Sequence, residues 1–207
     1  ILALIRRANT LRFRGDYAAS LVDIQEALRL SESDSSFQFY YAEGLRLKGL
    51  NLYRLGESRQ AVESLERSLS LYFAMNEKAR IPTVLMETGM VHGAVGDIDS
   101  ARHSYQKALK LKQAERDVHA QSEILNNLAV LYHQIGEYEL ASETFEEGLV
   151  CARKSRNTRA ESLLLTGLGD LYVEVEEFEA AAQAYRLAET ATGDLAGFIR
   201  NYLVIAR

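Results

Sequence analysis

Glycine recurs along this sequence at intervals of about forty residues, and this spacing restricts the chain to a repeated structure. The series is Gly15, Gly56, Gly96 and Gly136, with Glu176 at the fifth position, so the intervals are 41, 40, 40 and 40. Glycine tolerates the left-handed conformation that ends many helices, and an acidic residue after it can cap the next helix. The sequence therefore predicts five helical hairpins, each with its turn at one of these positions.

Small residues repeat in phase with the turns, seven positions before and five positions after each one. Small side chains at facing positions let two helix backbones approach closely, and the large residues four before and nine after the turn would fill the space beside them. A third small position, twelve after the turn, is expected to contact the following helix. The segments between turns are rich in strong helix formers, so the fold class is predicted to be all-α. The positions expected to shape the hairpins are Gly49, Gly56, Ala61, Gly89, Gly96, Ala101, Ala129, Gly136, Ala141, Gly169 and Ala181.

This pattern resembles the tetratricopeptide repeat along the whole chain. The resemblance rests on a small residue and a tyrosine before the turn, Gly-Asp/Glu-Tyr within it, and Ala-x-x-x-Phe-x-x-Ala after it. It implies a right-handed superhelical α-solenoid of helix-turn-helix repeats, with five units and the start of a sixth. The familiar repeat has about 34 residues, so the added residues are expected between units. A single solenoid domain is predicted, with units at about 1–34, 35–75, 76–115, 116–155 and 156–193 and a partial unit at 194–207.

Two positions bear on where helices begin and end. Pro82 is the only proline in the chain, and it predicts either a kinked helix or a helix that begins beside it. Glu176 replaces the turn glycine, which predicts either a strained left-handed residue or a distorted turn. The chain begins without methionine and ends on the apolar segment LVIAR, so we expect a fragment of a longer protein, or exposed ends that pair in a homodimer.

The resemblance also implies a partner-binding groove, because such solenoids bind along the first helix of each repeat. The arginines and the asparagine there would donate hydrogen bonds to a peptide or a helix, and the methionines would accommodate an apolar side chain. The methionines fit the hydrophobic core equally well. They also replace the residues with which chaperone cofactors of this family hold a terminal carboxylate, so that clamp is not expected. The expected groove residues are Arg12, Arg46, Tyr53, Arg54, Met86, Met90, Asn126, His133 and Asp170.

Composition and motifs argue against several classes of function. A net charge of −5 without a run of basic residues argues against nucleic-acid binding by this segment. The histidines lack metal-binding spacing, and no phosphate loop or nucleophile motif is present, so we expect no metal, no cofactor and no enzymatic activity. A single cysteine, Cys151, and the lack of a signal peptide or membrane-length apolar segment predict a cytoplasmic protein away from membranes.

Two functions remain open. Second helices end in related phrases, LYFAMNEKA, LKLKQAERDV and CARKSRNTRA. These are similar to the repeats of maltose-activator-like bacterial transcriptional regulators, which implies a region that senses a small inducer or a protein partner. The segment LNNLAVLYHQIGEYELA is similar to kinesin light chain repeats, which implies a free-standing adaptor that binds a peptide or helix in its groove. The sequences that flank this segment would distinguish the two.

Overall fold

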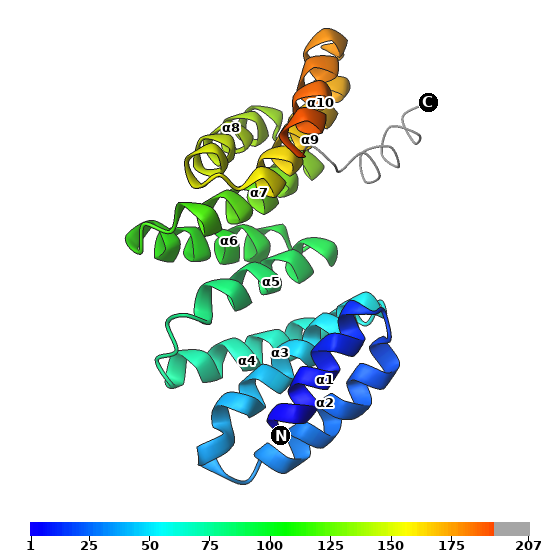
Figure 1. Cartoon of the computed structure of the whole chain (residues 1–207), viewed down its shortest axis with the longest axis vertical. Coiled ribbons are helices and arrows are strands. Elements are labelled where there is room, and N and C mark those ends of the chain that lie inside the picture. Colours follow the sequence, from blue (N-terminus) through cyan, green and yellow to red (C-terminus); the bar gives the residue numbers. More distant parts are fainter. Residues whose placement is uncertain (193–207) are drawn as a thin grey trace. The chain divides into compact units, whose positions relative to one another are not determined.

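The computed structural model describes residues 1–192, and this part of the chain is helical throughout, without a β-strand. The all-α prediction is confirmed (Figure 1). The predicted start of a sixth unit, at 194–207, lies outside the described residues. The elements are α1 (Leu2–Phe13), α2 (Tyr17–Ser31), the 3-10 helix η1 (Ser35–Phe37), α3 (Gln38–Arg54), α4 (Ser58–Ala74), α5 (Ile81–Ala94), α6 (Ile98–Ala114), α7 (Val118–Gln134), α8 (Tyr138–Ser155), α9 (Thr158–Glu174) and α10 (Phe178–Thr192).

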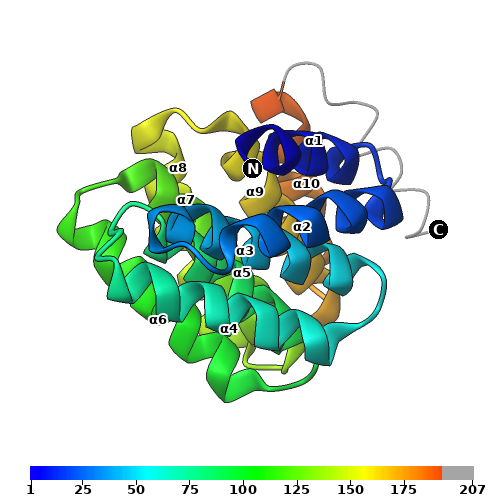
Figure 2. The same ribbon diagram turned by 90° about the horizontal axis from the view of Figure 1, so that it is seen from below.

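The helices form two compact groups, which we call the N-terminal group (residues 1–108) and the C-terminal group (from residue 109). In the N-terminal group, α2 packs against α1 and α3, and α4 packs against α3 and α5 (Figures 1 and 2). In the C-terminal group, α8 packs against α7 and α9, and α9 packs against α10. Within each group, a helix therefore buries its apolar side chains against the helices next to it in sequence.

The turns inside the hairpins share one geometry. The four turn glycines have φ between 77° and 83°. The residue after each glycine donates its N–H to the carbonyl five residues earlier, as in Asp97 to His92 at 3.0 Å, which satisfies a carbonyl that the helix end leaves free. Glu176 adopts φ 62°, and Glu177 makes the same bond to Tyr172 at 2.8 Å. The fifth turn therefore keeps the geometry of the others, with Glu176 as a strained left-handed residue, and it is not distorted.

Three of the four turns between hairpins also end in left-handed residues, and these are not glycines. The first such turn, between α2 and α3, contains η1 instead. Asn76, Arg116 and Arg156 have φ of 55°, 57° and 55°, again forty residues apart. Asp117 and Asn157 then accept hydrogen bonds from the N–H groups three residues later at 3.1 Å and cap the following helices. The chain is thus regular at the hairpin turns and, from Asn76 onward, at the turns between hairpins.

Side-chain capping after the turn glycines was predicted and is found at one of the four positions. Asp97 accepts a hydrogen bond from the N–H of Ser100 at 3.2 Å. Asp16, Glu57 and Glu137 make no side-chain cap bond, so the prediction is wrong for these three. Their carboxylates still lie beside the positive end of a helix.

Pro82 lies in the first turn of α5, which begins at Ile81. A proline is compatible with this position because the first N–H groups of a helix have no partner within it. The side chain of Pro82 is buried. The prediction of a helix that begins beside the proline is confirmed, and the alternative of a kinked helix is wrong.

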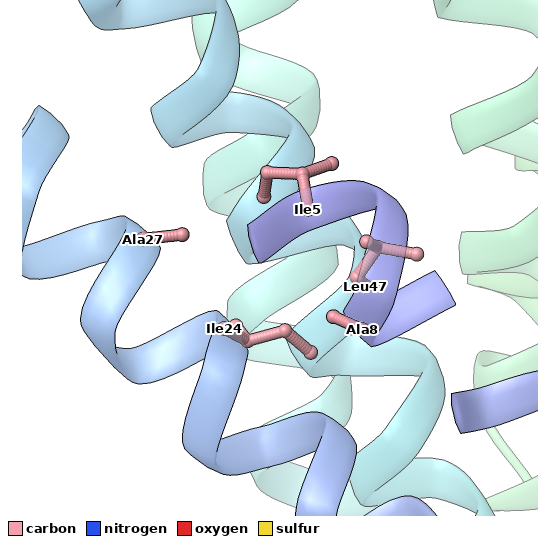
Figure 3. Packing of buried hydrophobic residues seen from close by; sticks show 5 residues of the cluster. All are labelled: Ile5, Ala8, Ile24, Ala27 and Leu47. Carbon is pink, nitrogen blue, oxygen red and sulfur yellow. The ribbon is translucent and has the colours of Figure 1, made fainter. Parts of the chain in front are cut away.

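The core of the first hairpin shows how small and large residues alternate. Ile5 and Ala8 of α1, Ile24 and Ala27 of α2, and Leu47 of α3 form one cluster (Figure 3), each with at most 6% of its surface exposed. The alanines let the helices approach, and the branched side chains fill the space between them.

Glycines allow a closer approach in the other hairpins. A Cβ built on Gly49 would lie 2.7 Å from Leu65 Cγ, and one on Gly169 would overlap the ring of Tyr185. Carbon atoms cannot approach each other so closely, so the large residue nine after the turn occupies the space beside the glycine seven before it.

Candidate functional site

A buried ionic cluster joins three helices of the N-terminal group. Arg46 of α3 donates to Glu43 at 2.6 and 3.1 Å, and to Glu87 of α5 at 2.6 Å. The hydroxyl of Tyr72 on α4 donates to Glu43 at 2.7 Å. The side chains of Arg46, Glu43 and Glu87 are only 12%, 12% and 15% exposed. We call these four residues the Arg46 cluster.

Burial and pairing shift the pKa values in this cluster in opposite directions. Burial raises the pKa of Glu87, and its Oε2 atom is buried without a hydrogen-bond partner among the described residues. Burial also acts against the charged form of Glu43, but the hydrogen bond from Arg46 lowers the pKa of that carboxyl. Burial opposes the charge of Arg46 as well, and the two glutamates outweigh it and raise the pKa of Arg46. Arg46 is therefore charged and has both sides of its guanidinium occupied.

Arg12 of α1 lies close to this cluster. Its Nε and Nη2 atoms donate to Asn9 at 3.3 and 3.1 Å, and its guanidinium lies 4.3 Å from the ring centre of Phe13. Burial, and then the positive charge of Arg46, lower the pKa of Arg12. The negative charge of Glu87 raises this pKa, and the positive charge of Arg54 lowers it. Because α3 contacts both α1 and α5, these residues lie near one another, and we call the surface around them the face formed by α1, α3 and α5.

Two guanidinium groups on this face have no carboxylate partner. Neither Arg12 nor Arg54 makes an ion pair with any residue between 1 and 192. Arg54 is exposed at the end of α3, with its guanidinium 6.0 Å from the ring centre of Tyr53. Phe13 is 75% exposed. We call Arg12, Phe13, Tyr53 and Arg54 the arginine-aromatic patch.

Within residues 1–192, the remaining predicted groove residues form no hydrogen bond or ion pair with one another. Met86 and Met90 are half-buried on α5. In the C-terminal group, the ring of His133 lies 5.9 Å from that of Tyr138, and Asp170 accepts a hydrogen bond from Tyr185 at 2.6 Å. The Oδ1 atom of Asn126 is buried without a hydrogen-bond partner in the described part of the chain.

The predicted hairpin residues fall into two sets. Gly56, Gly96 and Gly136 are exposed turn residues. The others are buried: Gly49, Ala61, Gly89, Ala101, Ala129, Ala141, Gly169 and Ala181.

Sequence reasoning missed Glu87, which carries much of the electrostatics of the face. It lies nine residues before the turn, between two groove positions, in the otherwise apolar segment IPTVLMETGM. An isolated acidic residue in such a helix indicates a buried partner of opposite charge. The partner, Arg46, comes from a different helix, so spacing within one helix does not reveal it.

Between residues 1 and 192, no group of three His, Cys, Asp or Glu side chains could hold a metal ion. Burial, and then the charge of Glu147, raise the pKa of the Cys151 thiol, which favours the unreactive protonated form. None of the helices between residues 1 and 192 is long and apolar enough to cross a membrane.

Comparison with protein families gives one match within the chain. A family described as tetratricopeptide repeat matches residues 80–154, a stretch that contains α5, α6, α7 and nearly all of α8. No protein among the curated sequences matches.

Solved structures with a similar fold are numerous. The crystal structure of BtubC from P. vanneervenii has a TM-score of 0.78 at 18% identity, over 92% of this chain and 78% of that chain. A putative kinesin light chain from Podosopora anserina, with nearly identical TPR-like repeats, has a TM-score of 0.78 at 12% identity, over 93% of this chain and 94% of that chain. A signal transduction ATPase with numerous domains from Pyrococcus horikoshii, which has a tetratricopeptide repeat sensor, has a TM-score of 0.74 at 21% identity, over 91% of this chain and 31% of that chain. These likenesses show the fold, a helical solenoid of the tetratricopeptide type.

Proposed function

We propose that this chain is a non-catalytic interaction module that binds an acidic peptide segment on the face formed by α1, α3 and α5. The observation that carries the proposal is the arginine-aromatic patch, where two arginines lack a carboxylate partner and lie beside two rings. Arginine forms two parallel hydrogen bonds to a carboxylate, and the aromatic rings offer apolar contact to neighbouring side chains of a peptide.

The Arg46 cluster has a different part in this proposal. Because Glu43 and Glu87 occupy the guanidinium of Arg46, the partner does not replace these bonds. The cluster holds α3 and α5 together, and its two glutamates offset the positive charge of Arg46. Arg46 is therefore proposed to position the patch, whereas Arg12 and Arg54 bind the partner.

The proposal can be tested with a short synthetic peptide that contains several glutamates and one tryptophan, and with its glutamine analogue. We expect the glutamate peptide to bind and the double variant R12A/R54A to weaken its affinity by about tenfold or more, because charge-assisted hydrogen bonds are lost. Isothermal titration calorimetry measures both. The control is R29A, which removes an exposed arginine that is already paired with Glu26. Equal affinity for the glutamate and glutamine peptides would contradict the proposal.

We further propose that the module is the sensing region of a bacterial transcriptional regulator. Support comes from the Pyrococcus horikoshii ATPase, whose tetratricopeptide repeat region is a sensor. The alternative is a free-standing adaptor, and the Podosopora anserina protein, which the similarity covers almost completely, favours it. Sequencing the gene on both sides of this segment tests the choice. A helix-turn-helix or a nucleotide-binding loop beside the repeats is expected for the regulator, and stop codons close to both ends would contradict it.

A further inference from the structure

A second candidate site lies between α2 and α3 of the N-terminal group. A hollow of about 200 Å³ is lined by Leu21, Ile24, Gln25 and Leu28 of α2 and by Lys48 and Leu52 of α3. None of these residues belongs to the Arg46 cluster or to the arginine-aromatic patch. The walls are mainly aliphatic, with one amine and one amide as polar groups.

The hollow lies between the second helix of the first repeat and the first helix of the second repeat, where the chain has smaller residues than at the equivalent positions of later repeats. Nine after the turn, Ile24 takes the position that Tyr105 and Phe145 take in later copies. Four before the turn, Leu52 takes the position of Tyr132 and Tyr172. An aliphatic side chain at both positions leaves unfilled the space that a ring would occupy.

The equivalent positions between the second and third repeats carry different side chains. There His92 replaces Leu52, and its Nε2 atom lies 3.5 Å from a carboxylate oxygen of Glu66. Glu66 stands where the first copy has Gln25. The open space and the positive charge of Lys48 beside it are thus particular to α2 and α3.

Lys48 gives the hollow its chemical preference. Its side chain is half-buried, and it makes no hydrogen bond or ion pair with any residue in 1–192. An amine at the edge of an aliphatic cavity pairs most favourably with an anion whose remaining part is apolar. The volume of the hollow limits the size of the ligand, since an apolar cavity of about 150 Å³ holds benzene.

We propose that this hollow binds a small organic carboxylate, with an aliphatic or aromatic body of about six carbons against the leucines and its carboxylate on Lys48. The site is independent of the peptide-binding face, so either proposal can fail without the other. A ligand of this kind would fit the role of a small inducer.

The experiment is a titration of the whole chain, with isotope-labelled methyl groups, with sodium hexanoate and with 1-hexanol, its uncharged analogue. We expect hexanoate at about 10 mM or below to shift the methyl signals of Leu21, Ile24, Leu28 and Leu52. Hexanol should bind more weakly. The variant K48M should weaken hexanoate binding by about threefold to fivefold, as expected for a partly exposed ion pair, and should leave hexanol unaffected.

Two further variants test the cavity itself. L52Y introduces the residue that the chain uses at the same position in later copies, and it should abolish the methyl shifts with both compounds. If L52Y does not fold, I24F, which introduces the ring that Phe145 has at the equivalent position, serves the same purpose, and a thermal melt identifies which variant is folded. The proposal is overturned if hexanoate shifts none of the four methyl groups, if hexanol binds as tightly as hexanoate, or if a folded cavity-filling variant binds hexanoate unchanged.

Discussion

At the scale of single residues, the left-handed positions at helix ends govern this fold. Glycine adopts this conformation without strain at four turns, whereas Glu176 adopts it with φ 62°. For a residue with a Cβ, the left-handed region costs about 1–2 kcal/mol. The carboxylate of Glu176 is exposed and makes no hydrogen bond in the described part of the chain that would compensate.

Replacing Glu176 by glycine should therefore stabilise the protein. We expect E176G to raise the free energy of unfolding by about 0.5–1 kcal/mol, less than the full strain, because glycine also gains freedom in the unfolded chain. Urea denaturation followed by circular dichroism measures the change. E174G is the matched control, since Glu174 lies in the last turn of α9 and should lose stability on the same substitution. A loss of stability in E176G as well would contradict the strain argument.

The close approach at Gly49 leads to a second prediction. G49A places a methyl group 2.7 Å from Leu65 Cγ and 3.0 Å from the Ala61 carbonyl oxygen, so we expect a loss of about 1–3 kcal/mol from overpacking. The loss should shrink in a background that carries L65A, because the main obstacle is then gone. A double-mutant cycle by urea denaturation measures this coupling. Additive effects of the two substitutions would show that Leu65 is not the cause.

These residues also show what sequence can reveal at this scale. Turn glycines repeat visibly, and they predicted the hairpin turns because few other residues suit φ near 80°. Unit boundaries were predicted beside Arg116 and Arg156, but arginine has no preference for the left-handed conformation, so that conformation is visible only in the structure.

At the scale of elements, α3 is the most strongly connected helix of the N-terminal group. It packs against α2 and α4, and the Arg46 cluster ties it to α5. Removing one partner of a buried ion pair costs more than the pair contributes, since the remaining charge is left uncompensated.

Arg46 should therefore be one of the most sensitive positions in the chain. We expect R46M to lower the free energy of unfolding by about 3 kcal/mol or more, because Glu43 and Glu87 would lose their counter-ion. Thermal and urea denaturation measure the loss. R29A serves as control because it removes an exposed pair, and it should leave the transition unchanged within error. A stability of R46M equal to that of R29A would argue against a buried cluster.

The pair of Arg7 on α1 and Asp23 on α2 predicts a dependence on pH. The hydrogen bonds from Arg7, at 2.5 and 2.6 Å, lower the pKa of Asp23. A carboxyl whose pKa is lowered by folding stabilises the folded protein at pH values above its usual pKa of 3.8. This stabilisation is lost as the pH falls from there through the lowered pKa of the folded protein. D23N should thus melt at a lower temperature than the parent at pH 7, and the difference should shrink below pH 3.8.

A control for this prediction is D99N, because Asp99 has a side chain that is 91% exposed. Its melting temperature should follow that of the parent at every pH. A difference between D23N and the parent that stays constant down to the acid limit would mean that the effect comes from packing and not from the charge of Asp23.

Helix positions were accessible from the sequence, whereas contacts between helices were less so. The small residues at Gly49 and Gly169 predicted close hairpins, because their spacing from the turn fixes which side chains face each other. The pairing of Arg46 with Glu87 depends on how α3 and α5 lie side by side, and no spacing along the chain encodes it. The hollow beside Lys48 was likewise not predicted from the sequence, because it follows from the absence of aromatic rings that other copies possess.

At the scale of the whole molecule, the chain is a series of similar hairpins, and contacts within each group are made mostly between neighbouring helices. Solenoids of this kind gain stability from each repeat and from each interface between repeats. The forty-residue period was sufficient to predict this architecture. The identity of the partner was not accessible in this way, because it depends on exposed side chains that the repeat leaves free to vary.

The division into two groups suggests a test of how independent they are. We expect a fragment of residues 1–117 to fold by itself, because the Arg46 cluster and the first core cluster lie entirely within it. Its melting temperature should be lower than that of the whole chain, since repeat interfaces are lost. Circular dichroism during heating measures both. A fragment without helical signal or without a cooperative transition would show that the first hairpins depend on the rest of the chain.

The two kinds of turn have a consequence for how such a gene can change in length. Every hairpin turn closes with the same hydrogen bond, from the residue after the left-handed position to the carbonyl five residues earlier, and the turns at Asn76, Arg116 and Arg156 close with it as well. A segment of forty residues, cut at equivalent points, therefore begins and ends in the same backbone geometry. Recombination between misaligned copies would insert or remove one complete hairpin and would leave both junctions intact, so lineages of this protein can differ by whole multiples of forty codons.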